Sequence, residues 1–301
     1  MTASTGAQTT SGVTTPTTDE PATAAPIPGW PDGVIIDFEL EYDNRARWPH
    51  FPEYFRAWRE GSARLRAAGG RLDVSYGPDP GQRVDLFGDG PTRLVFFHGG
   101  YWRALDKDDF SWVAGPLVAA GLSVAVVNYD LCPAVTLGRQ VEQCREVIDW
   151  LARDSSGEQI VAGHSAGGHQ VAMLLATDWA GRGHARDPIA GAISLSGLFE
   201  LAPLARTAMN ADLRIDDAVA AGLSPARLPR RSAAPLVLAV GEQESSEFHR
   251  QSAALARAWG EPDGVLSVAG ANHFDVLDAL TDLSGELWRR ARARRHSSPD
   301  R

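Results

Sequence analysis

Gly163-His164-Ser165-Ala166-Gly167 is the stretch of sequence that decides the fold. It follows a short apolar run at residues 159–162 and precedes a stretch at 166–180 whose composition predicts a helix. A serine set between small residues at a tight turn from strand to helix has its hydroxyl held out at the carboxyl end of a sheet. The helix dipole behind it favours the anion that forms on attack. The motif therefore predicts Ser165 as a nucleophile.

Strands and helices alternate on both sides of this turn. Apolar runs predict further strands at 94–97, 122–127, 189–195, 236–240 and 265–268, and helical spacing predicts a helix over 137–153. A terminal helix is expected from about Phe274 into the Arg-rich C-terminus, to which we assign no function. This alternation indicates an α/β fold with a mostly parallel central sheet and helices on both faces.

The segments before residue 94 differ from this pattern. Residues 1–28 are mostly Thr, Ala, Pro and Ser and are expected to form a disordered tail. Residues 42–68 space their aromatic side chains helically, which indicates core packing or the wall of a pocket. Strands at 72–76 and 83–87 are separated by a Gly- and Pro-rich stretch that favours a tight turn, so we expect an antiparallel N-terminal hairpin.

The domain organisation follows from these segments. We expect a single catalytic domain over residues 29–301. Within it, residues 201–231 are helical in pattern and interrupted by prolines, as expected of a small helical cap inserted over the sheet edge. This insertion is a candidate lid.

A second glycine-rich motif, His98-Gly99-Gly100-Tyr101-Trp102, directly follows the strand at 94–97. Glycines allow backbone N–H groups to approach a substrate oxygen, and this loop is where such a fold places half of its oxyanion hole. We therefore expect the N–H groups of Gly99 or Gly100 and of Ala166 to stabilise a tetrahedral intermediate, with His98 as a structural hydrogen-bonding residue. Loss of one such donor typically raises the barrier by roughly 2.7–4 kcal/mol.

A serine nucleophile needs a general base, and His273 suits that role best among the eight histidines. It lies in Gly270-Ala271-Asn272-His273-Phe274, just after the last predicted strand, and completes the chain order serine, acid, histidine. The acid should follow the strand at 236–240, where the loop offers Glu242 and Glu244. Spacing alone does not choose between them.

Composition excludes several other classes of protein. The formal charge of −9 argues against a nucleic-acid partner, because phosphate binding needs a basic face. Cys132 and Cys144 are too few for a disulfide framework and match no metal-site spacing. No apolar run reaches the length of a membrane span, and the N-terminus lacks the features of a signal peptide. We expect a cytoplasmic protein whose partner is a small-molecule substrate. The sequence does not determine the oligomeric state, and a homodimer is one of the alternatives.

Taken together, the motifs resemble the kynurenine formamidase (arylformamidase) group of α/β-hydrolases over nearly the whole chain after the tail. The serine turn is shared by the entire fold, whereas the strings at 98–102 and 247–252 are more discriminating. The matching strings are Glu41-Tyr42-Asp43-Asn44-Arg45-Ala46, Tyr76-Gly77, His98 to Trp102, Gly163 to Gly168, Glu247-Phe248-His249-Arg250-Gln251-Ser252 and His273-Phe274.

The resemblance implies an acid, an activity and a mechanism. The family's acid directly precedes a Ser-Pro-Glu-Phe-like string, which maps it onto Glu244, although Glu stands here where Asp is frequent and Ser246 where Pro is usual. The implied reaction is hydrolysis of N-formyl-L-kynurenine to kynurenine and formate through an acyl-enzyme on Ser165, with no metal and no cofactor. Tyr101 and Trp102 would stack on the aryl group or hold their loop by packing.

Two other functions compete with this one. A carboxylesterase or amidase acting on another small ester or amide would use identical machinery, because fold and triad do not determine the substrate. A hydrolase-fold binding protein without turnover would be expected to lack the serine or the histidine, and both are present.

Overall fold

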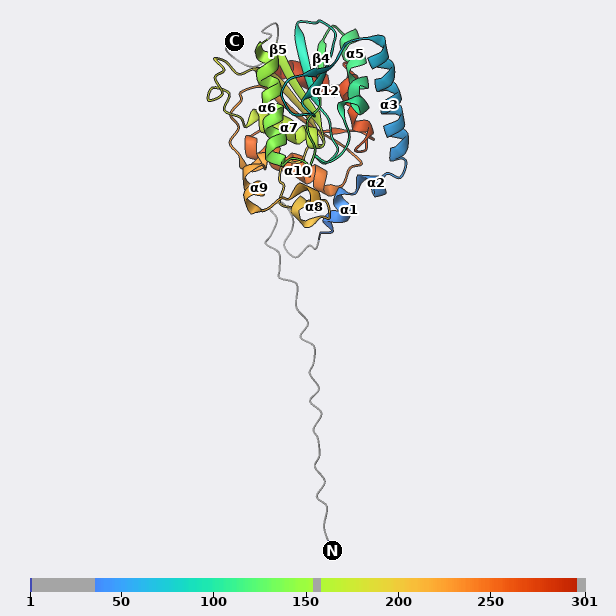
Figure 1. Ribbon diagram of the computed structural model, residues 1–301, viewed down its shortest axis with the longest axis vertical. Helices are drawn as coiled ribbons and strands as arrows, with labels where there is room; N and C mark the ends of the chain where they lie inside the picture. The colour runs from blue at the N-terminus through green and yellow to red at the C-terminus, as the bar shows by residue number, and fades with distance from the viewer. Residues whose placement is uncertain (2–35, 154–157, 297–301) are drawn as a thin grey trace. The chain divides into compact units, whose positions relative to one another are not determined.

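The computed structural model of the protein describes Met1, residues 36–153 and residues 158–296 (Figure 1). The described residues from 36 onward group into one compact unit. Apart from Met1, the tail predicted at residues 1–28 lies outside the described residues.

A central eight-stranded sheet has the order β1-β2-β4-β3-β5-β6-β7-β8. The first three strands in this order pair antiparallel with one another, and every later pairing is parallel. The predicted N-terminal hairpin and mostly parallel sheet are therefore confirmed. The strands are β1 Arg71–Ser75, β2 Arg83–Phe87, β3 Thr92–Phe97, β4 Ser123–Val127, β5 Glu158–His164, β6 Ile189–Leu195, β7 Leu236–Gly241 and β8 Val265–Val268.

Helices cover both faces of this sheet and enclose two apolar layers (Figure 1). One layer lies beneath α6 (Leu137–Arg153), α7 (Ala166–Leu175) and α10 (Ser246–Trp259). The other lies beneath α3 (Phe51–Ala68), α5 (Ala114–Ala119) and α12 (Glu286–His296). The remaining helices are short: α1 Phe38–Tyr42, α2 Asn44–Arg47, α4 Lys107–Phe110, α8 Asn210–Leu213, α9 Asp217–Gly222 and α11 Asp278–Thr281.

Strand β3 shows why its sequence forms a central strand. Its last four residues are fully buried, and successive side chains of a strand point to opposite faces. Val95 and Phe97 therefore enter the α6 layer, whereas Leu94 and Phe96 enter the α3 layer. A strand covered on both faces has to be continuously apolar, and this is the pattern that the sequence contains.

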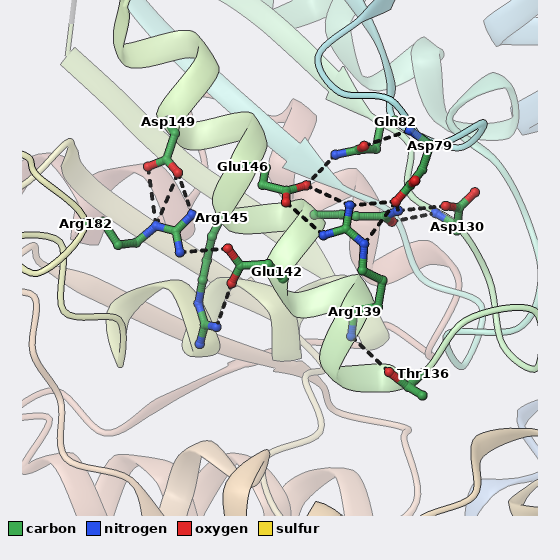
Figure 2. A network of polar contacts seen from close by, with 11 residues as sticks. Asp79, Gln82, Asp130, Thr136, Arg139, Glu142, Arg145, Glu146, Asp149 and Arg182 are labelled. Carbon is green, nitrogen blue, oxygen red and sulfur yellow. Dashed lines mark hydrogen bonds and ion pairs between the residues drawn. The ribbon is translucent and has the colours of Figure 1, made fainter.

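Helix α6 is also fastened by ion pairs along its length (Figure 2). Arg139 bridges Asp79, in the turn between β1 and β2, and Glu146, which lies about two turns further along the same face of α6. Further along, Arg182 pairs with Glu142 and Asp149. These contacts tie α6 to the hairpin at one end and to the loop after α7 at the other.

Three predicted elements differ from the structure at their ends. The helix expected over 166–180 ends at Leu175. The single helix expected from Phe274 is instead a 3₁₀ turn at Asp275–Leu277 followed by α11 and α12, because the Asp282 carboxylate accepts hydrogen bonds from the backbone and hydroxyl of Ser284 in the turn between them. The helix expected over 42–68 begins only at Phe51, after α1 and α2, each capped by an aspartate carboxylate, Asp37 and Asp43.

Candidate active site

Ser165 lies at the turn between β5 and α7, as its motif predicts. Its backbone has φ of 56° and ψ of −118°, a strained conformation for a residue with a side chain. The turn is so tight that a Cβ on Gly163 would overlap the carbonyl of Gly167, and a Cβ on Gly167 would overlap the carbonyl of Phe97. The small residues of the motif are therefore required by packing, and they hold Ser165 at the carboxyl end of the sheet.

Ser165 opens into a cavity of about 580 Å³. The wall comes from helices α1 to α4, the loop after β3, the end of β5, the insertion at 208–212, and the turn that carries His273. Phe55 and Trp58 of α3 line this cavity and also pack in the core, so the aromatic residues of that helix have both of the roles considered for them.

His273 and Glu244 form a buried hydrogen-bonded pair at this cavity. Nδ1 of His273 lies 2.6 Å from Oε2 of Glu244. Since a carboxylate only accepts hydrogen bonds, Nδ1 carries the proton and Nε2 is left as the basic nitrogen. The other carboxylate oxygen of Glu244 accepts hydrogen bonds from the Ser196 hydroxyl and from the backbone N–H of Gly241. Both oxygens of Glu244 are therefore held in place.

Glu242, the alternative acid, faces another way. It is exposed, and its carboxylate accepts a hydrogen bond of 2.7 Å from the backbone N–H of Gly270. The structure thus places Glu244 against His273, whereas Glu242 is hydrogen-bonded to the turn that precedes His273.

The ring of His273 is enclosed by side chains that determine its orientation. Phe248 lies 4.4 Å away between ring centroids, and His164 lies 4.7 Å away. Nε2–H of His164 donates to the backbone carbonyl of His273 over 2.8 Å. Burial, together with electrostatic repulsion from His273, holds the pKa of His164 well below its usual value, so His164 is a neutral donor that anchors His273. Among the described residues Ser165 makes no hydrogen bond with His273, a contact that commonly tightens only when substrate binds.

The predicted oxyanion donors lie at the cavity that Ser165 lines. Gly99 and Gly100 line the cavity, and a Cβ on Gly99 would lie 3.1 Å from Cβ of Ser165. Ala166 is the first residue of α7, where backbone N–H groups have no partner within the helix. Within the described ranges, the N–H groups of Gly99, Gly100 and Ala166 donate to no protein acceptor. The described site therefore holds three unpaired donors at the cavity that Ser165 lines.

Tyr101 and Trp102 have different positions. Tyr101 lines the cavity, and its hydroxyl donates to the backbone carbonyl of Tyr42. Trp102 is fully buried, packs edge-on against His169 and does not line the cavity. Of the two roles expected for Trp102, stacking on substrate is therefore corrected in favour of packing the loop, and of these two residues only Tyr101 lines the cavity.

Sequence reasoning missed a buried polar cluster that supports the site. Glu247, Arg250 and Gln251 of α10 meet Tyr42 of α1 and Glu200 of the loop after β6. Gln251 accepts hydrogen bonds from the backbone of Phe199 and Glu200 and donates to the Tyr42 hydroxyl. The signal was present, because the strings at 41–46 and 247–252 were both singled out, but nothing in the sequence indicated that they contact each other.

The candidate lid contributes directly to the cavity wall. Ala208, Met209 and Asp212 line it, and Asp212 pairs with Arg103 of the loop after β3 at 2.5 Å. Whether this insertion moves stays a prediction.

The described part of the chain offers neither a metal-binding group nor a membrane-spanning helix. No group of three or more His, Cys, Asp or Glu side chains is arranged to hold a metal ion. No helix over these ranges is long and apolar enough to cross a membrane. Both cysteines are buried and unpaired.

Comparisons with known proteins point to one group. Residues 94–257 match the family model described as the alpha/beta hydrolase fold. The chain is 30% identical to a kynurenine formamidase of Salmo salar over 84% of this chain and 94% of that protein, and 31% identical to one of Danio rerio with the same coverage. A crystal structure from Silicibacter sp. TM1040, provisionally named a thioesterase, is 30% identical and superposes with a TM-score of 0.78, covering 85% of this chain and 99% of that one.

Proposed function

Because this chain belongs to the kynurenine formamidase family of α/β-hydrolases, we propose that it hydrolyses N-formyl-L-kynurenine to L-kynurenine and formate. The chain is an arylformamidase-like hydrolase, and the finer proposal concerns its substrate and its use of Ser165. The observation that carries it is the pairing of His273 with Glu244 at the cavity onto which Ser165 opens, beside unpaired N–H groups.

The first half of the proposed cycle forms an acyl-enzyme. Ser165 Oγ attacks the formyl carbon while Nε2 of His273 takes the hydroxyl proton. Glu244 keeps His273 in the required tautomer and stabilises the imidazolium. The N–H groups of Gly99 or Gly100 and of Ala166 bind the oxyanion. The C–N bond then breaks as His273 protonates the leaving arylamine, and the formyl group remains on Ser165 as an ester.

The second half uses the same groups in reverse. Water enters the cavity and gives a proton to His273 as it attacks the formyl ester. The second tetrahedral intermediate is held by the same donors, and its collapse returns the proton to Ser165 and releases formate. One water is consumed for each formamide cleaved, and no group outside the chain is needed in this scheme.

The test compares two substrates on three proteins. Wild-type enzyme is mixed with N-formyl-L-kynurenine and, separately, with p-nitrophenyl acetate, and product absorbance is followed. We expect rapid kynurenine release that falls by about 10³-fold or more in Ser165→Ala, since removing a triad nucleophile leaves only residual catalysis. Ser284→Ala, a serine in the turn between α11 and α12, is the matched control and should behave as wild type.

The competing function is a carboxylesterase, which the same machinery would support. Turnover of p-nitrophenyl acetate that depends on Ser165, without turnover of the formamide, would favour that function and refute the formamidase proposal. Formamide turnover that persists in Ser165→Ala would refute the proposed nucleophile.

A further inference from the structure

Two arginines line the cavity among the described residues, and they differ in their partners. Arg103 is neutralised by its ion pair with Asp212. Arg45, in α2, makes neither an ion pair nor a hydrogen bond through its side chain in the described part of the chain. It is therefore the cation at this cavity whose hydrogen-bond donors remain available to a ligand.

Arg45 is held in position by aromatic rings. Its guanidinium lies 5.3 Å from the ring centroid of Phe51 and 5.7 Å from that of Phe55. Phe55 itself lines the cavity, which places the charge at the cavity wall. Stacking on rings occupies the flat face of a guanidinium and leaves the N–H groups along its edge free. Those edges match a carboxylate in a two-point contact.

The local backbone supports this position of Arg45. Asp43 caps α2 by accepting a hydrogen bond of 2.9 Å from the N–H of Ala46, so its carboxylate is committed to the helix end. Asn44 is buried and its side-chain amide donates to the Tyr101 hydroxyl over 3.1 Å. The residues on both sides of Arg45 are therefore fixed, and α2 is joined to the loop that carries Gly99 and Gly100.

We propose that Arg45 is a specificity residue that binds the carboxylate of the substrate's amino-acid group, so that the enzyme prefers anionic aryl formamides to neutral ones. This inference rests on the proposed function and adds the class of substrate. The aryl formamide reaches Ser165, and the charged group at the far end of the same molecule contacts Arg45. Arg45 takes no part in bond making, so it acts on binding.

The test measures steady-state kinetics with a charged and a neutral substrate. N-formyl-L-kynurenine carries the carboxylate, and formanilide is an aryl formamide without one. In Arg45→Gln we expect KM for N-formyl-L-kynurenine to rise about tenfold, as expected for loss of one charge-assisted contact, with kcat little changed. Both constants for formanilide should stay at wild-type values. Arg45→Lys should recover part of the loss.

Arg56→Gln is the matched control, because Arg56 is an exposed arginine of α3 that does not line the cavity. It should leave both substrates unchanged. Equal effects of Arg45→Gln on the two substrates, or no effect on either, would overturn the inference while leaving the proposed function intact. A wild-type enzyme that cleaves formanilide but not N-formyl-L-kynurenine would instead refute the proposed substrate and this inference with it.

Discussion

Glu244 is the residue on which the orientation of His273, the proposed general base, depends. It receives hydrogen bonds from His273, Ser196 and Gly241, and it is buried. A carboxylate here keeps the proton on Nδ1 of His273, and in the proposed mechanism Nε2 then acts on Ser165. An amide of the same shape would present a donor to Nδ1 and so favour the wrong tautomer.

We therefore predict that Glu244→Gln lowers kcat for the formamide by about 10⁴-fold, the size of effect known for the corresponding change in a serine protease triad. Glu242→Gln changes the same chemical group two residues away, where the carboxylate contacts only the backbone of Gly270 in the described structure. It should keep kcat within a few-fold of wild type. Equal losses in the two variants would show that the acid has been assigned wrongly.

Most residues of the candidate site can be predicted from the sequence, but the kind of signal differs from one residue to the next. Ser165 and His273 follow from local strings next to strands, so no tertiary information is needed. Glu242 and Glu244 lie in one turn, and only the backbone path shows which carboxylate faces inward. Trp102 follows two glycines and Tyr101 in a loop with positive φ angles, so its direction could not be read from the sequence.

Helix α10 is the element that joins the site to the N-terminal helices. Phe248 packs against the ring of His273, while the neighbouring Glu247, Arg250 and Gln251 contact α1 and the loop after β6. Glu247 is fully buried, and Arg250 pairs with it and with Glu200. A buried charge that loses its partner is costly, so the whole cluster depends on Arg250.

We predict that Arg250→Met lowers the free energy of unfolding by about 3–5 kcal/mol. The substitution removes the guanidinium that pairs with the carboxylates of Glu200 and Glu247. Arg257→Met, an exposed position on the same helix, should change it by less than about 0.5 kcal/mol. Urea unfolding of both variants at pH 7 provides the measurement. A stability of Arg250→Met equal to that of Arg257→Met would show that the cluster contributes nothing to the fold.

Elements were predictable where one physical pattern dominates. The apolar strands and the Gly- and Pro-rich hairpin turn were identified because burial on both faces and turn chemistry leave strong local signals. The sequence predicts a continuous C-terminal helix because apolar residues recur on both sides of the turn at 282–285 and lead into the Arg-rich end. There, the hydrogen bonds that the Asp282 carboxylate accepts from Ser284 compete successfully with helix propensity.

The molecule as a whole buries several neutral histidines around the sheet's carboxyl end. Burial lowers the pKa of His98, of His164 and of His169, that of His169 to about 4. In the unfolded chain these groups titrate near pH 6.5. Below that pH the unfolded state binds more protons than the folded state, so stability falls as pH drops. For His169 the loss begins near pH 6.5 and is complete near pH 4.

We predict that His169→Gln reduces this acid sensitivity. Glutamine can still donate to the carbonyl of Leu223, as Nε2 of His169 does over 2.8 Å, and it does not titrate. Between pH 7 and pH 5 the wild type should lose about 2 kcal/mol more unfolding free energy than the variant. His50→Gln replaces an exposed histidine and is the control. Its unfolding free energy should change with pH as that of the wild type does. Parallel pH profiles for wild type and His169→Gln would contradict this account.

The central claim is that the chain cleaves an aryl formamide through a formyl ester on Ser165. It is tested most directly by quenching a single turnover of N-formyl-L-kynurenine in acid and examining the digested protein by mass spectrometry. The account predicts one formyl group on the peptide that contains Ser165, formed together with the first equivalent of kynurenine and absent from Ser165→Ala. Kynurenine released at the same rate with no formyl group on that peptide, or with Ser165 replaced, would contradict it.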